Sequence, residues 1–128
     1  MSRTLFAALG LVCAAAAAFA AGPALTAAEM SALLAKGLTV SSTDMQGGKT
    51  YTARIVLAPN GNLTGSLTPA GQAAIALNGK WTQKGAQLCR TLAPIQPEEI
   101  CETWLKNGAT EIVVQVAGKE VAVNRWQP

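Results

Sequence analysis

The feature that most limits the fold of this chain is an alternation of apolar and polar residues on both sides of Pro59-Asn60-Gly61. Residues 50–57 and 63–68 both show the period of two that is typical of strands with one buried face. The turn itself fits a type I turn followed by a glycine in the left-handed region. Such a three-residue loop sets Leu57 opposite Leu63, so the apolar residues of both segments share one face. The sequence therefore predicts a β-hairpin in this register.

Short apolar runs separated by turn signals continue as far as Trp126. A two-residue loop at Lys84-Gly85 would set Trp81 opposite Leu88, and Asn107-Gly108 is a strong hairpin signal. We expect about seven or eight strands between residues 50 and 126, preceded by a further short segment of strand character at 38–42. The predicted fold class is all-β, a small antiparallel up-and-down barrel or a curled sheet.

One helix is predicted before the strands. Thr26 and Glu29 have the spacing of a capping box. In this motif the Thr26 hydroxyl accepts a hydrogen bond from the Glu29 amide, and the Glu29 carboxylate accepts one from the Thr26 amide. Met30 and Leu34 follow at helical spacing, and Gly37 is a typical residue just beyond a helix end. We expect a helix over about 27–36 that closes one end of the sheet.

The N-terminal 20 residues have the pattern of a secretory signal peptide. Arg3 precedes an apolar run from Leu5 to Phe19, and Ala18-Phe19-Ala20 fits the small-x-small cleavage pattern. The run is too short and too rich in alanine to predict a membrane span. Cleavage before Ala21 would leave residues 21–128 as a single domain in the periplasm or outside the cell. Its scattered basic residues predict neither a nucleic-acid partner nor a membrane partner.

Two cysteines, Cys89 and Cys101, remain after loss of the signal, which removes Cys13. An even number in an exported chain predicts a disulfide. Closing the loop between Cys89 and Cys101 stabilises the folded state by roughly 3 kcal/mol in the chain-entropy model. Two cysteines in a chain without histidine cannot complete a zinc site, so we expect no metal and no cofactor.

The chain lacks the residue patterns of familiar catalytic sites. It contains no histidine, the commonest general base, and no Ser-x-x-Lys or Gly-x-Ser-x-Gly motif that would activate a nucleophile. The adjacent acids Glu98 and Glu99 lie in a proline-containing loop, where solvation is the simplest expectation. We therefore expect a protein that is not an enzyme.

Strand alternation predicts charged side chains on the face that carries the tryptophans. If Trp81 and Trp104 point inward, then Arg90 and Glu102 do too. A two-residue loop at Gly118-Lys119 would add Arg125 to this side at the far end. Either the charges form a sealed ion pair or are exposed at a barrel mouth, or they line a pocket for a polar or acidic ligand with the tryptophans as walls. The opposite orientation, with both cysteines inward, would remove both interpretations.

The disulfide itself predicts how these charges would meet. Setting Cys89 directly opposite Cys101 makes Arg90 and Glu102 diagonal neighbours, a separation that long side chains can bridge.

The motifs Gly79-x-Trp81, Leu88-Cys89 and Cys101-x-x-Trp104 resemble those of a group of small exported bacterial proteins. The resemblance covers roughly residues 51–126 and implies no particular activity. The chain also resembles small secreted protease inhibitors of the calycin-like barrel type, which carry one disulfide and an apolar N-terminal trunk. Here the trunk would be residues 21–26, whereas the G-x-W motif lies in the middle of the chain and not at the start of the barrel.

These observations together predict an exported, monomeric, non-enzymatic binding or interaction module whose partner is a protein or a small molecule. The alternatives are a carrier of a small polar or acidic ligand in the barrel interior and a protein similar to protease inhibitors.

Overall fold

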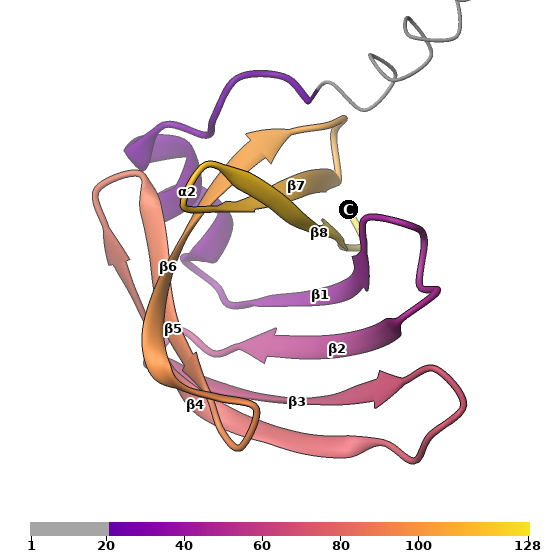
Figure 1. Ribbon diagram of the computed structural model, residues 1–128. Helices are drawn as coiled ribbons and strands as arrows, with labels where there is room; N and C mark the ends of the chain where they lie inside the picture. The colour runs from indigo at the N-terminus through magenta and orange to yellow at the C-terminus, as the bar shows by residue number, and fades with distance from the viewer. Residues whose placement is uncertain (1–20) are drawn as a thin grey trace, which may run out of the picture.

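Eight antiparallel strands form a closed barrel in the computed structural model, which describes residues 21–128 (Figure 1). Each strand pairs with the next along the chain, and the last pairs with the first. The strands are β1 (Leu38–Asp44), β2 (Tyr51–Leu57), β3 (Asn62–Pro69), β4 (Ile75–Lys84), β5 (Gln87–Leu92), β6 (Gln96–Lys106), β7 (Glu111–Val116) and β8 (Lys119–Arg125). The predicted all-β class is confirmed, in its closed form. The predicted signal peptide lies outside the described residues.

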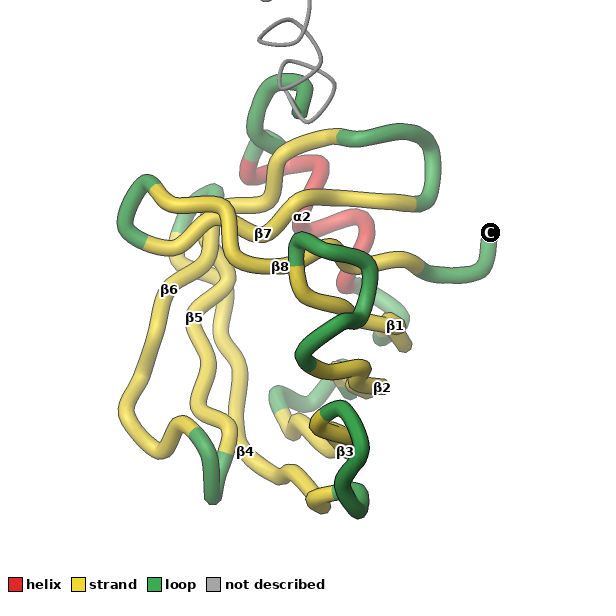
Figure 2. Tube along the Cα trace, turned by 45° about the vertical axis from the view of Figure 1, so that its right-hand side comes forward, coloured by secondary structure: helices red, strands yellow, loops and turns green. Residues whose placement is uncertain are grey.

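The helix α2 (Ala27–Leu34) begins at the predicted capping box. Thr26 Oγ1 accepts a hydrogen bond from the Glu29 amide at 3.1 Å, and Glu29 Oε1 accepts one from the Thr26 amide at 2.9 Å. The helix ends two residues before the predicted position, and Gly37 leads the chain into β1. Met30 and Leu34 are buried in the barrel core, so α2 covers one end of the barrel, behind the strands in Figure 2. Within residues 21–128 no helix is long and apolar enough to cross a membrane.

The hairpin registers agree with the prediction at one turn and differ at another. Leu57 pairs with Leu63, as the Pro59-Asn60-Gly61 loop predicts. Trp81 pairs with Arg90, not with Leu88, because Lys84 remains in β4 and the loop lies one residue later. The resulting shift is two residues, and a shift of two leaves every side chain on its predicted face.

The last hairpin corrects the prediction for β8. Its loop is Ala117-Gly118, and both residues have the positive φ angles, 51° and 80°, that a type I′ turn requires. A bulge then shifts the register, so Val114 pairs with Ala122 and not with Val123. This one-residue change reverses the faces of β8, which places Ala122 and Asn124 inward and turns Arg125 outward.

Glycine allows β4 and β5 to approach each other closely. A Cβ atom on Gly79 would lie 2.0 Å from the carbonyl oxygen of Thr91. No side chain fits in this space, so Gly79 permits the close backbone contact by which the sheet bends into a small barrel.

Candidate functional site: the barrel cavity

The barrel interior contains a cavity of about 210 Å³ that is partly open to solvent, because its lining includes the exposed side chains of Ile95 and Val121. Its walls are mostly aliphatic side chains from strands all around the barrel, including Val40, Ile55, Leu67, Leu77 and Val114. None of the lining residues belongs to α2, so the cavity lies in the part of the barrel that the helix does not fill. It is smaller than the roughly 300–1,000 Å³ of typical ligand pockets. Only a small molecule can occupy it.

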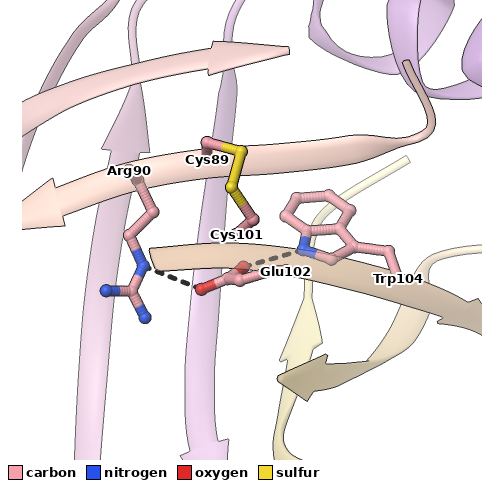
Figure 3. Close-up of polar contacts among 5 residues, drawn as sticks. All are labelled: Cys89, Arg90, Cys101, Glu102 and Trp104. Atoms are coloured by element: carbon pink, nitrogen blue, oxygen red, sulfur yellow. Dashed lines mark hydrogen bonds and ion pairs between the residues drawn. A yellow bond between two sulfur atoms is a disulfide. The ribbon is translucent and has the colours of Figure 1, made fainter. Parts of the chain in front are cut away.

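An ion pair inside the barrel connects β5 and β6 beside this cavity (Figure 3). Arg90 Nε donates to Glu102 Oε2 at 2.8 Å, and the indole Nε1 of Trp104 donates to Glu102 Oε1 at 2.9 Å. The Arg90 and Glu102 side chains are 15% and 8% exposed. The predicted contact between them is confirmed. Both oxygens of the carboxylate have a partner, and the pair as a whole carries no net charge.

Two buried polar atoms that belong to residues lining the cavity have no hydrogen-bond partner. They are Arg90 Nη1, a donor, and Asn124 Oδ1, an acceptor. Asn124 is only 6% exposed and comes from β8, whereas Arg90 comes from β5. Buried polar groups in folded proteins almost always have partners. Both atoms are almost fully buried, so a molecule in the cavity can pair with them after a small movement of the two side chains.

Ser42 and Tyr51 complete the polar part of the lining. Burial raises the pKa of the Tyr51 phenol, and the nearby carboxylates of Asp44 and Glu102 act in the same direction. The phenol is therefore neutral at physiological pH. Tyr51 therefore adds no charge to the lining of the cavity.

The disulfide lies on the opposite face of the same two strands. Cys89 and Cys101 are bonded and directly opposite each other in the register, with Leu88 opposite Glu102. The sequence leaves open whether the cysteines or the charged residues face the barrel interior. Because the cysteines lie on the outer face, their neighbours Arg90 and Glu102 point inward. Glu99 lies within 4.8 Å of both sulfurs, but sulfurs that are bonded to each other are not thiolate ligands for a metal.

Two of the predicted cluster residues lie elsewhere. Trp81 packs against the core and donates its indole N–H to the carbonyl oxygen of Ala58 at 2.8 Å, but it does not line the cavity. Arg125 points outward and pairs with Glu111 at 2.7 Å, because the β8 bulge reverses its face. Of the two tryptophans predicted as pocket walls, only Trp104 has that role.

Sequence reasoning missed the polar lining residues Ser42, Tyr51 and Asn124. The predicted register that turns Arg125 inward implies an outward side chain for its neighbour Asn124. A buried asparagine between apolar residues of a strand is the signal that could have found it, since its side chain requires partners.

Comparisons with protein-family models, with curated proteins and with solved structures gave no match to this chain. The cavity and its polar atoms are therefore the observations from which a function can be argued.

Proposed function

We propose that this protein is an exported, non-enzymatic binding protein that holds a small molecule inside its barrel. The observation that carries the proposal is the mostly apolar cavity inside the barrel, whose lining residues include two with an unpaired, buried polar atom, Arg90 Nη1 and Asn124 Oδ1. Ligand sites commonly combine an apolar surface with a few polar groups that orient the ligand. If Arg90 and Glu102 formed only a structural ion pair, the hydrogen bonds of Glu102 would be explained. The unpaired Asn124 Oδ1 and Arg90 Nη1 would still have no role.

Export is supported by the disulfide, which fits an oxidising compartment, and by the signal pattern of residues 1–20.

A protease-inhibitor role has less support. The segment that would form the inhibitory trunk runs along β6 and is hydrogen-bonded to it. The Gly22 amide donates to the Lys106 carbonyl, and the Leu25 amide donates to the Trp104 carbonyl at 2.8 Å. Leu25 is also part of the barrel core. A segment held in this way is not free to enter the active site of a protease.

Native mass spectrometry of the full chain, purified without denaturation from cells that export it, tests the proposal. We expect a retained small molecule that is lost when the cavity is filled by Ala53→Leu, because Ala53 lines it. Ala76→Leu, on the exposed face of β4, is the matched control and should retain the molecule. The same retained mass in all three proteins would contradict binding inside the barrel.

A further inference from the structure

The chemistry of the cavity also indicates which class of molecule it holds. This inference rests on the proposed function. We propose that the ligand is an uncharged molecule with an aliphatic body and a polar group that both accepts and donates hydrogen bonds, such as a primary amide or an alcohol. Of the polar or acidic ligand that the sequence suggested, this proposal keeps the polar option and sets aside the acidic one.

The first step concerns an anionic ligand. Arg90 is the cation of the lining, and its Nε already donates to Glu102 at 2.8 Å. A ligand carboxylate would bring a second anion to the same guanidinium, next to Glu102. The site would then hold a net negative charge between aliphatic walls, where an uncompensated ion is far less favourable than a neutral polar group.

The second step concerns a cationic ligand. An ammonium group would be a second cation beside Glu102, whose single negative charge is already balanced by Arg90 at 2.8 Å. The remaining polar residues of the lining are Ser42, Tyr51 and Asn124, and all are uncharged at neutral pH. A buried ammonium would therefore have no ion to balance it.

The third step is what the unpaired atoms require. Arg90 Nη1 can only donate, so it needs an acceptor on the ligand, and Asn124 Oδ1 can only accept, so it needs a donor. The aliphatic walls suit an aliphatic body. A neutral amide or alcohol meets all three requirements without adding charge.

A series of ligands with one tail and different polar groups tests this inference. Hexanamide, hexan-1-ol, hexanoate and hexylammonium are titrated near neutral pH into the full chain, and binding is followed by NMR of the cavity methyl groups and the Trp104 indole. We expect hexanamide to bind at least about tenfold more tightly than either ion. Hexanoate or hexylammonium binding as tightly as hexanamide would overturn the proposed ligand class.

Two charge-changing variants extend the test. Glu102→Gln leaves Arg90 without its anion and should shift the preference toward hexanoate by at least about tenfold. Asn124→Asp adds an anion to the cavity and should shift the preference toward hexylammonium instead. An unchanged preference in both folded variants would show that these residues do not select the ligand. The wild-type series decides the ligand class even where a variant does not fold.

The outcomes separate this inference from the proposed function. A preference for an ion, together with loss of binding in Ala53→Leu, would overturn the ligand class and leave small-molecule binding in the barrel intact. If none of the four compounds binds and the purified protein retains no small molecule, the proposed function itself is wrong.

Discussion

Removing the carboxylate of Glu102 should destabilise the protein strongly. Glu102→Leu breaks the 2.8 Å contact with Arg90 and the 2.9 Å contact with the Trp104 indole, and it leaves the Arg90 side chain, which is only 15% exposed, without an anion. A hydrogen bond between charged groups is worth about 1.5–3 kcal/mol, and the stranded cation adds the cost of an unpaired buried charge. We expect the free energy of unfolding to fall by about 3–5 kcal/mol.

Urea unfolding followed by tryptophan fluorescence measures this change. The matched control is Glu99→Ala, which breaks an exposed ion pair of nearly the same length between β4 and β6. Lys84 and Glu99 are 2.9 Å apart with side chains 58% and 48% exposed, so solvent screening limits the expected loss to at most about 1 kcal/mol.

A double variant shows whether the cost comes from the stranded charge. Arg90→Met together with Glu102→Leu removes both ions, and we expect it to recover most of the stability lost in the single variant, because an apolar pair can replace a buried ion pair. The reasoning is refuted if Glu102→Leu costs no more than Glu99→Ala, or if the double variant is less stable than the single one.

Four further measurements test other parts of the structure. Unreduced, denatured protein should show no free thiol at Cys89 or Cys101 on labelling, and stoichiometric labelling would contradict the disulfide. Trp81→Ala should lower the free energy of unfolding by about 3 kcal/mol, the lower end of the range for truncating large core aromatics, because this side chain is only half-buried. An unchanged urea midpoint would contradict this. Gly79→Ala should destabilise the barrel, since its Cβ would lie 2.0 Å from a backbone oxygen, and wild-type stability would show that the strands can separate there. Hydrogen bonds from the Thr50 hydroxyl and amide hold the pKa of Asp44 far below its usual value, so its contribution to stability is present above about pH 4 and is lost as pH falls toward the folded-state pKa. Asp44→Asn should therefore lose less stability than wild type between about pH 4 and pH 2, and equal losses would refute this role.

Local sequence patterns predicted the elements and most of the topology. The capping box at Thr26 and Glu29 and the hairpin at Pro59-Asn60-Gly61 are local arrangements, in which the residues that set the geometry are neighbours in the chain. The meeting of Arg90 and Glu102 was also predictable, because a disulfide fixes the relative register of the two strands that it joins.

The errors arose where several turn positions satisfied the same local pattern. Gly118 can be the first or the second residue of a two-residue loop, so the sequence permits both Gly118-Lys119 and Ala117-Gly118. Only the pairing of β8 with β7 and with β1 selects Ala117-Gly118 and the bulge that follows. That bulge exchanges Arg125 for Asn124 on the inner face. A single residue of register thus changed the polar lining of the cavity.

The sequence by itself determined the fold class, the helix start and the pairing of the cysteines. Alternation and helix capping depend on residues that are close together in the chain, and two cysteines can pair in only one way. The tertiary structure alone decided that the barrel closes, that the cysteines face outward and that a cavity remains inside. Closure and cavity volume depend on the total volume of the side chains that many strands place in one interior. No single segment of the sequence determines that total.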